Sequence, residues 1–412
     1  MNEKYLTINA GSSSLKFSLY EANGKEIVNG LIEKIGNDDS GYTLKFDDKK
    51  IEKQMLIRNH TEAVNAMISE LLENKFIISK DEIKGIGHRV LHGGEKYSDS
   101  VLIDEEVIKT IKDLTKLGPL HHPGEIAGIE SMIKFFPGVP QIAVFDTAFH
   151  QTMPKQNFMY AIPYLWYKEH GVRKYGFHGT SHKYITEVMK KHYNKEDVNL
   201  IICHIGSGAS ISAIKNGKCY NTSMGLTPVD GLVMGTRCGA IDPSIVEYIC
   251  KEANITVEQA VEILNKKSGL FGLCGKNDFR DVENLAKNGD KNAQIALAIF
   301  KKSIIDYIAQ YYFQLNGEID ALVFTAGIGE NAINLRRDIV NSISKPMRIL
   351  LDEKENDKIS RGKEKTSGII STDSSSFEVV VVPTNEEFMI LKDTYDIANK
   401  YYIEQKEKQK VL

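Results

Sequence analysis

One pattern of residues occurs twice in this 412-residue chain, and it limits the possible folds more than any other feature. Residues 6–25 read LTINAGSSSLKFSLYEANGK, and residues 201–218 read IICHIGSGASISAIKNGK. Each segment contains an apolar strand pattern, a turn of glycine and serine, a second alternating strand pattern and then Asn-Gly-Lys, which is a tight-turn signal. Glycine and serine favour turns in any protein, so chance can produce one such match. The agreement of four features in the same order favours a duplicated segment.

Strand and helix patterns alternate along the rest of the chain. The strand patterns occupy residues 83–90, 141–145, 200–204, 321–325 and 379–383. Helical periodicity is found at residues 61–75, 104–115, 124–135, 181–193, 243–252, 256–266, 290–315 and 385–405. This alternation predicts an α/β fold with central sheets covered by helices. Together with the repeat, it predicts two homologous lobes that face each other, each aiming its Gly-Ser hairpin into a shared cleft that closes on a ligand.

The charge balance and the cysteines exclude several classes of protein. Lys and Arg number 52 and Asp and Glu number 55, so the formal charge is −3, which argues against a dedicated nucleic-acid binding protein. No apolar run is long enough to cross a membrane, and the first residues lack the pattern of a signal peptide. The five cysteines contain no C-x-x-C pair, which is typical of reduced thiols. We therefore expect a cytoplasmic protein that binds neither nucleic acid nor membrane.

The two Gly-Ser turns are candidate phosphate sites. Backbone N–H groups in such a turn are not obstructed by Cβ atoms, and serine hydroxyls such as those of Ser12 and Ser14 add further donors. Lys16 can place its ammonium on the same anion. Neither turn fits the P-loop or the dinucleotide-binding pattern. A third turn, TAGIGEN at residues 325–331, follows an apolar strand and is either a nucleotide contact or a plain tight connection.

Seven motifs between Ile8 and Glu387 resemble the motif series of acetate kinases, in the same order: INAGSSSLK, GHRVLHGG, VFDTAFHQTMP, YGFHGTSH, MGTRCGAIDP, FTAGIGEN and PTNEE. That family has the duplicated, ribonuclease H-like fold of sugar kinases, Hsp70 and actin, with the nucleotide in the cleft between two domains. The resemblance implies an N-terminal lobe of residues 1–147 plus 388–412 and a nucleotide-binding lobe of residues 148–387. It also implies reversible phosphoryl transfer between ATP and acetate, giving acetyl phosphate and ADP, with Mg²⁺ or Mn²⁺ and in a homodimer.

The resemblance assigns site residues motif by motif. Its catalytic residues are Asp146, His178, Arg237 and His121, and its acceptor-binding residues are Arg89, Leu91, Leu120 and Pro228. Its nucleotide-binding residues are Lys16, Ser12, Ser14, His204, Ile205, Gly206, Ser207, Gly208, Asp278, Phe279, Arg280, Gly327, Ile328, Gly329, Glu330 and Asn331. Its metal-site residues are Asn9 and Glu386, with Glu387 as a further candidate.

The chemistry of the reaction explains why these residue types are needed. Arginine binds carboxylate and phosphate through a planar fork that stays charged. Acetate is already ionised at neutral pH and needs no general base, so we expect Asp146 to orient Arg237 or metal-bound water. We expect His182 to lie near the first turn of the helix predicted at residues 181–193, with Ser181 as the candidate N-cap of that helix.

The chain departs from the family pattern at several positions. Ser207 stands in place of a common asparagine, and Gly118 and His122 replace a frequent alanine and asparagine. Leu91 replaces a valine of the acyl pocket, and a larger wall is expected to favour acetate by only about 1–3 kcal/mol per methylene. A propionate kinase and a non-catalytic nucleotide-dependent switch of the same fold remain the alternatives.

Overall fold

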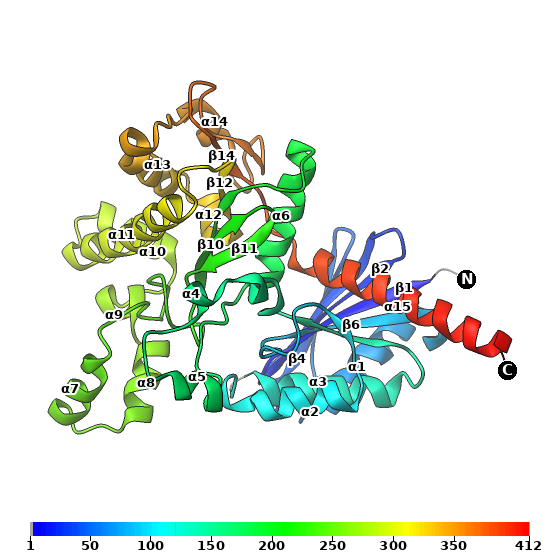
Figure 1. Cartoon of the computed structure of the whole chain (residues 1–412). Coiled ribbons are helices and arrows are strands. Elements are labelled where there is room, and N and C mark those ends of the chain that lie inside the picture. Colours follow the sequence, from blue (N-terminus) through cyan, green and yellow to red (C-terminus); the bar gives the residue numbers. More distant parts are fainter. Residues whose placement is uncertain (1–2, 120, 412) are drawn as a thin grey trace. The chain divides into compact units, whose positions relative to one another are not determined.

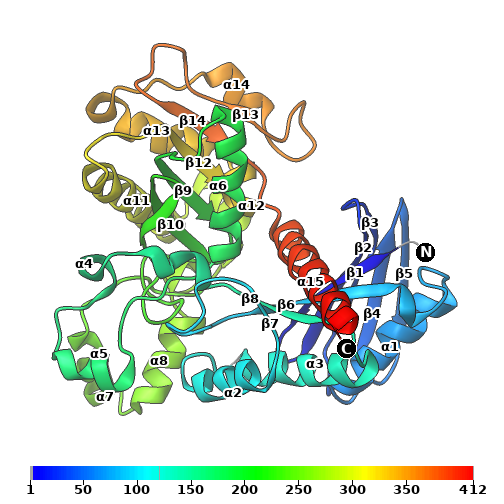
Figure 2. The same ribbon diagram turned by 45° about the vertical axis from the view of Figure 1, so that its right-hand side comes forward.

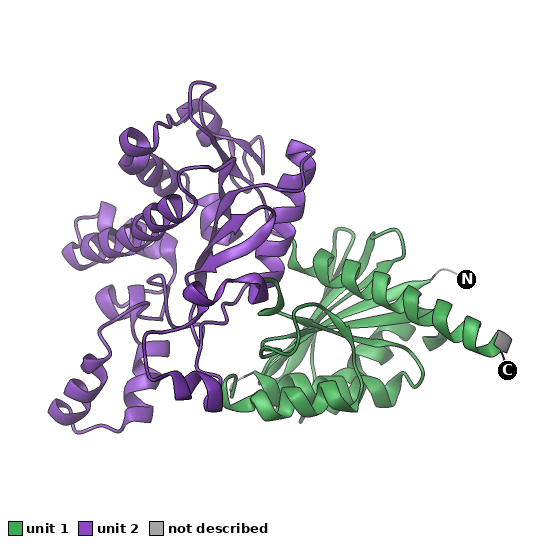
Figure 3. Cartoon of the chain, in the orientation of Figure 1, with its two compact units in different colours: residues 1–149, 385–412 green, residues 150–384 purple. Residues whose placement is uncertain are grey.

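The structure is a computed structural model that describes residues 3–119 and 121–411. The chain forms two compact units, Met1–Phe149 with Asn385–Leu412 as unit 1 and His150–Thr384 as unit 2 (Figure 3). The boundaries of these units lie a few residues from those expected for the two lobes. Among the described residues, no helix combines the length and the apolar character needed to cross a membrane.

Unit 1 is built on a mixed sheet with the strand order β5-β4-β3-β2-β1-β6-β8-β7 (Figure 1). Its strands are β1 (Lys4–Ala10), β2 (Ser14–Glu21), β3 (Glu26–Glu33), β4 (Gly41–Phe46), β5 (Lys49–Gln54), β6 (Ile83–Val90), β7 (Val101–Leu102) and β8 (Gln141–Phe145). Its helices are α1 (His60–Glu73), α2 (Glu105–Asp113), α3 (His122–Phe135) and α15 (Glu386–Val411), with 3₁₀ turns at Lys80–Glu82 and Leu114–Lys116. A further 3₁₀ turn, Ala148–Thr152, spans the boundary between the two units in the sequence.

Alternate residues of β1 pack on opposite faces of this sheet. Leu6 and Ile8 belong to the core that includes Met67 of α1 and Met132 of α3. Tyr5 belongs to a separate core, together with Ile390 and other residues of α15. Side chains alternate between the two faces of a strand. The apolar side chains of the segment YLTI (residues 5–8) therefore pack into both cores, one on each face of the sheet.

Unit 2 is built on a mixed sheet with the order β11-β10-β9-β12-β14-β13. Its strands are β9 (Leu200–Ile205), β10 (Ala209–Lys215), β11 (Lys218–Thr222), β12 (Ala321–Thr325), β13 (Gly368–Ile369) and β14 (Glu378–Val381). Figures 1 and 2 show α6 on one side of the sheet and α11 on the other. The helices are α4 (Lys155–Phe158), α5 (Tyr164–His170), α6 (Gly179–Tyr193), α7 (Ser244–Glu252), α8 (Val257–Lys266), α9 (Gly269–Cys274), α10 (Phe279–Lys287), α11 (Lys291–Gln314), α12 (Ala326–Asn331), α13 (Ile333–Met347) and α14 (Glu353–Lys358).

The two sheets repeat one topology. The order β3-β2-β1-β6-β8 in unit 1 corresponds to β11-β10-β9-β12-β14 in unit 2. In both, the first two pairings are antiparallel and the last two are parallel. Gly24 follows Asn23 with φ +87°, and Asn216 and Gly217 have φ +51° and +71°, as tight hairpin turns require. The duplication predicted from the hairpins is confirmed.

Most elements expected from the sequence lie within a few residues of their predicted places. The strand patterns at 83–90, 141–145 and 321–325 coincide with β6, β8 and β12. Several elements were not predicted, among them strands β4 and β5 and helices α10 and α13. Strand β5 reads KKIEKQ and is mostly exposed, so it lacks the apolar alternation by which a strand is recognised.

Helix α3 packs directly on the first Gly-Ser turn, and one glycine makes this approach possible. A Cβ on Gly124 would lie 2.3 Å from the carbonyl oxygen of Gly11, which also accepts a 2.7 Å hydrogen bond from Nε2 of His60. Because backbone atoms cannot move aside as a side chain can, we expect Gly124→Ala to lower the free energy of unfolding by about 1–3 kcal/mol. Urea unfolding measures this change.

The matched control lies on the exposed face of the same helix. Lys134→Ala is expected to change the free energy of unfolding by less than about 0.5 kcal/mol. Equal stability of the Gly124→Ala and Lys134→Ala proteins would show that the close approach contributes nothing.

Candidate active site

The carboxyl ends of the parallel strands β6 and β8 bring Arg89 and Asp146 together in unit 1. Nε of Arg89 donates to Oδ1 of Asp146 at 3.1 Å, and Nη2 donates to Oδ2 at 2.5 Å. Asp146 is buried, and its charge is the main cause that raises the pKa of Arg89 above its ordinary value. The guanidinium therefore stays charged and is held in one orientation by a two-pronged contact. Asp146 orients Arg89 in this way, while its expected contact with Arg237 stays a prediction.

The first turn of α15 adds carboxylates to unit 1. Glu387 forms an ion pair with Lys16 and accepts a 3.2 Å hydrogen bond from Oγ of Ser18. Burial and, after it, the charge of Asp146 raise the pKa of Glu386, while Arg89 and Lys16 lower it. Asn9 on β1 lies opposite Lys16 on β2 in the antiparallel register.

The side-chain oxygens of Asn9 and Glu386 are of the chemical types that coordinate magnesium. Mg²⁺ prefers carboxylate and amide oxygens, which Glu386 and Asn9 carry. The pKa of Glu386 is raised by burial and by a like charge, and a divalent cation relieves both effects.

Glu125 is part of the same unit but was not found from the sequence. Its Oε1 accepts a hydrogen bond from the backbone N–H of Leu91 at 3.1 Å. Burial raises the pKa of Glu125 to about 8 and lowers the pKa of His122 to about 4. Nε2 of His122 lies 3.9 Å from Oε2 of Glu125, and because burial favours the neutral form of both side chains, we do not count this contact as an ion pair.

Three positions that are expected from the sequence to depart from the family pattern pack against one another. A Cβ on Gly118 would lie 2.9 Å from Cδ2 of Leu91 and 3.3 Å from the ring of His122. The larger side chains of Leu91 and His122 therefore fit because residue 118 has no side chain. His121 is exposed as the residue before α3, and Leu120 lies outside the described residues.

In unit 2 the predicted residues His178 and Arg237 meet at Gly208. A Cβ on Gly208 would lie 3.4 Å from Nη1 of Arg237 and 3.5 Å from Nε2 of His178. Nη1 of Arg237 also donates to the carbonyl oxygen of Pro228 at 3.1 Å. Burial lowers the pKa of Arg237, and no carboxylate among the described residues forms an ion pair with it. Its charge is therefore available to an anion.

The start of α6 differs from the expectation in one respect. His178, with φ +57°, is the residue that precedes the helix, so the prediction that Ser181 caps it is wrong. The Ser181 hydroxyl instead contacts Nδ1 of His204 at 2.8 Å and Oγ1 of Thr384 at 2.7 Å. The ring of His204 stacks on His178 with centroids 4.2 Å apart. His182 lies in the first turn of α6, as predicted.

A pocket of about 680 Å³ in unit 2 is lined by half of the predicted nucleotide-binding residues. Ligand pockets commonly have about 300–1,000 Å³, so this volume suits a small molecule of nucleotide size. Hydrogen bonds from Arg280 lower the pKa of Asp278, at the rim, to about 2. The lining residues are Gly206, Ser207, Asn277, Asp278, Phe279, Arg280, Glu283, Gly327, Ile328, Asn331, Ala332, Ser360 and Arg361.

Some predicted residues lie behind this pocket, and some lining residues were not predicted. The side chain of Ile205 is fully buried, and the carboxylate of Glu330 accepts a hydrogen bond from the Thr384 N–H at 3.0 Å. No motif had identified Ser360 and Arg361. Both donate to Oδ1 of Asn331, at 3.3 and 2.7 Å, which joins them to the predicted TAGIGEN turn.

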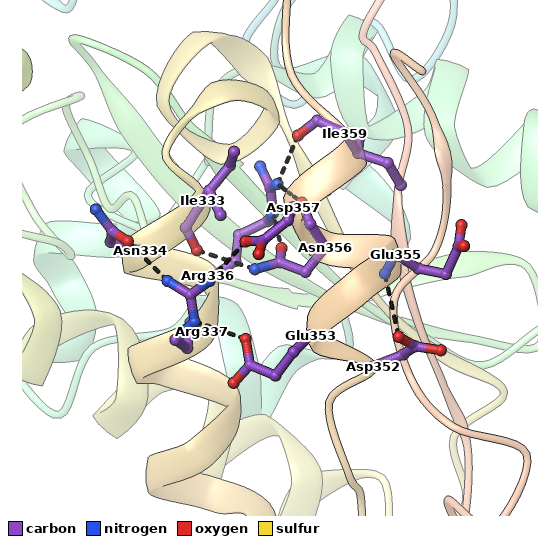
Figure 4. A network of polar contacts seen from close by, with 10 residues as sticks. All are labelled: Ile333, Asn334, Arg336, Arg337, Asp352, Glu353, Glu355, Asn356, Asp357 and Ile359. Atoms are coloured by element: carbon purple, nitrogen blue, oxygen red, sulfur yellow. Dashed lines mark hydrogen bonds and ion pairs between the residues drawn. The ribbon is translucent and has the colours of Figure 1, made fainter. Parts of the chain in front are cut away.

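Arg336 is a buried arginine on α13 that links α12 to the segment before Ser360, and Figure 4 shows its contacts with Asn356 and Ile359. Nη1 of Arg336 donates to the carbonyl oxygens of Gly329 and Glu330 at 3.0 and 2.7 Å. Nε and Nη2 donate to Asn356, and Nη2 also donates to the Ile359 carbonyl at 2.7 Å. Arg336 is 0% exposed, so its charge is balanced by carbonyl dipoles at the end of α12 and in the segment before Ser360.

The duplicated sheets have the topology of the fold shared by actin, Hsp70 and the sugar kinases. The model of the acetokinase family matches residues 4–392. The acetate kinase of Clostridium novyi (strain NT) is 46% identical over 403 residues, which cover 96% of this chain and 99% of that protein.

Solved structures agree with the sequence comparison. The acetate kinase of Porphyromonas gingivalis has a TM-score of 0.90 at 40% identity and covers 96% of this chain and 99% of its own. A propionate kinase from Francisella tularensis subsp. tularensis SCHU S4 has a TM-score of 0.89 at 42% identity and covers 96% of this chain and 100% of its own. The chain therefore belongs to the acetokinase family, as its motifs predicted.

Loss of the Arg336 side chain is expected to destabilise unit 2. In Arg336→Ala several buried carbonyl oxygens lose their donors, at about 1–3 kcal/mol each, so the free energy of unfolding is expected to fall by at least about 3 kcal/mol. The neighbouring Arg337 forms ion pairs with Glu353 and Asp357 at the surface, and Arg337→Ala is expected to cost at most about 1 kcal/mol. Urea unfolding of both variants measures the difference, and equal losses would contradict the assignment.

Glu125 makes stability depend on pH. The folded protein keeps its proton up to about pH 8, whereas the unfolded chain releases it near the ordinary pKa of 4.5. Between these values the folded state binds more protons, so this group's contribution to the free energy of unfolding decreases as the pH rises. The glutamine of Glu125→Gln accepts the same hydrogen bond and does not titrate.

We therefore expect the wild type to lose stability relative to Glu125→Gln between about pH 5 and about pH 8. Urea unfolding at the two pH values gives this difference. Any slope that comes from His122 is common to both proteins and cancels. A stability difference that is the same at both pH values would contradict the buried, protonated state of Glu125.

Proposed function

We propose that the chain catalyses reversible transfer of the γ-phosphoryl group of ATP to acetate, giving acetyl phosphate and ADP. The observation that carries the proposal is the meeting of Arg237 and His178 at Gly208, next to Ser207 of the pocket. Phosphoryl transfer needs donors and positive charge on the oxygens of the transferring group, and these two side chains supply both. The relatives named acetate kinase support acetate as the acceptor.

Unit 2 binds the nucleotide in this proposal. The adenosine part occupies the pocket lined by Asp278, Phe279 and the TAGIGEN turn. The backbone N–H groups of Ser207 and Gly208 are the phosphate donors of this turn in the proposal, since that of Gly206 donates to the carbonyl oxygen of Gly208 at 3.0 Å. Arg237 and His178 stabilise the equatorial oxygens of the group in transfer, because charge on these oxygens is what the transition state must accommodate.

Unit 1 binds the acceptor and the metal. Arg89, held by Asp146, anchors the acetate carboxylate, and Leu91 contacts the methyl group. One carboxylate oxygen attacks the γ-phosphorus, a new P–O bond forms, and the bond to the ADP oxygen breaks. The acid is already ionised, so no residue has to remove a proton. Asn9 and Glu386 would hold Mg²⁺, which when bound neutralises charge on the phosphate oxygens.

A homodimer is proposed on the basis of exposed apolar side chains in unit 2. Trp166 on α5 is 51% exposed and Tyr248 on α7 is 66% exposed, with Val257 and Val261 on α8 also exposed. Helix α7 packs against α8. Covering such groups with a second copy removes apolar surface from water. The location proposed is the cytoplasm, because the five cysteines are thiols in the structure.

The decisive experiment is a trap for the acyl phosphate. Purified protein is incubated with ATP, Mg²⁺, acetate and hydroxylamine, and acetohydroxamate is measured. We expect hydroxamate that depends on both ATP and acetate, and a fall in kcat of about 10³-fold in Arg237→Ala. The control variant is Arg337→Ala, which is expected to keep wild-type kcat. ATP binding without any hydroxamate would show a nucleotide switch instead of a kinase.

The same assay separates acetate from propionate. We expect a higher kcat/KM for acetate, by about 10- to 200-fold, because one methylene contributes about 1–3 kcal/mol in an apolar pocket. A higher value for propionate would identify a propionate kinase.

A further inference from the structure

The ring of His178 is held by a serine that also contacts a second histidine. Nδ1 of His178 lies 2.9 Å from Oγ of Ser210, and Nε2 of His182 lies 2.8 Å from the same oxygen. Ser210 is on β10, opposite His204 of β9, and is 0% exposed. His182 follows His178 by about one turn of α6 and is also 0% exposed.

The serine hydroxyl can donate only one hydrogen bond. If both imidazoles donated to Oγ, the buried serine proton would have no acceptor among the described residues, since the two rings are the only partners of that hydroxyl there. One ring therefore donates to Ser210 and the other accepts from it.

The other ring nitrogen of His182, Nδ1, determines which of the two histidines donates to Ser210. In the described part of the chain, Nδ1 of His182 is buried and has no hydrogen-bond partner. Burial also lowers the pKa of His182 well below its ordinary value, so this ring carries a single proton. A buried N–H without an acceptor is rarer in proteins than a buried acceptor without a donor. The proton of His182 therefore lies on Nε2 and is donated to Ser210.

The direction of the remaining bonds then follows. Ser210 donates its hydroxyl proton to Nδ1 of His178, which leaves the proton of a neutral His178 on Nε2. That nitrogen faces Gly208 beside Nη1 of Arg237. An N–H donor at this place is attracted to a phosphoryl oxygen, whereas a lone pair would repel it.

We propose that Ser210 and His182 are positioning residues that hold neutral His178 in the tautomer with its proton on Nε2, so that it donates to the transferring phosphoryl group. The statement that His178 donates to the transferring phosphoryl group rests on the proposed function. The tautomer itself is a property of the protein alone and can be measured without any substrate.

The first measurement is NMR of the ¹⁵N-histidine-labelled protein, in which the nitrogen shifts report the protonated ring nitrogen. The signals of His178 are identified by their absence in His178→Gln. We expect a proton on Nε2 and a lone pair on Nδ1 in the wild type, and a mixture of tautomers in Ser210→Ala. A proton on Nδ1 of His178 in the wild type would overturn the proposal.

The second measurement is kinetic and uses a matched control on the same strand. Ser212 is also on β10 and 0% exposed, but its hydroxyl donates to Oγ1 of Thr222 at 2.9 Å. We expect Ser210→Ala to lower kcat at least about 10-fold with the KM for ATP nearly unchanged, and Ser212→Ala to keep wild-type kcat. An equal loss in both variants would reduce the effect to that of any buried hydroxyl and overturn the proposal.

The third arm tests His182 with two substitutions of similar size. His182→Gln keeps an N–H near the position of Nε2, and we expect it to retain most of kcat. His182→Met removes that donor, and we expect the same loss as in Ser210→Ala. Equal kcat in these two variants would contradict the donor role. If the wild type forms no acyl phosphate, the proposed function fails, whereas the NMR result still decides the tautomer.

Discussion

The parallel pairing of the central strands is the constraint on which the candidate site depends. Strands β1, β6 and β8 run in one direction in unit 1, and β9, β12 and β14 run in one direction in unit 2. Because parallel strands end at the same edge of a sheet, the residues that follow them lie close together within each unit. Asp146 follows β8, Leu91 follows β6 and Gly206 follows β9. The parallel strands of each sheet therefore place these candidate site residues at one edge of that sheet.

Three arginines differ in their hydrogen-bond partners, and these partners determine whether the guanidinium charge is available to a ligand. Arg89 is held by the Asp146 carboxylate through two bonds and so presents a fixed orientation. Arg336 is fully buried, and its guanidinium donates to carbonyl oxygens of the backbone and to the side-chain amide oxygen of Asn356, which makes it a structural link. Arg237 is partly buried, with a carbonyl contact and no ion pair to an acidic residue in the described chain. Of the three, Arg237 has the charge that an incoming phosphoryl group can use.

The motifs named candidate residues for the chemistry, but not the residues that contact and orient these candidates. Arg89, His178, Arg237 and the TAGIGEN turn stand out because glycines and short motifs surround them in the sequence. Glu125, Ser210 and Arg336 stand in ordinary helix or strand patterns, where buried contacts leave no local sign. Each acts on residues that are distant in sequence or on another element, such as Leu91, which lies 34 positions from Glu125. Such contacts appear only when the elements are packed.

The sequence by itself determined the α/β class, the duplicated hairpins, the central strands and the family, because these follow from local periodicity and from short motifs. Only the tertiary structure decided that Asp146 pairs with Arg89, that Gly118 makes room for Leu91 and His122, and that one serine joins His178 to His182. The physical reason is that burial and hydrogen-bond direction depend on which segments meet in space. In a buried hydrogen-bond network, the atom that carries each proton is determined by all the donors and acceptors of the network together. The order of residues along the chain does not show which of these groups come into contact.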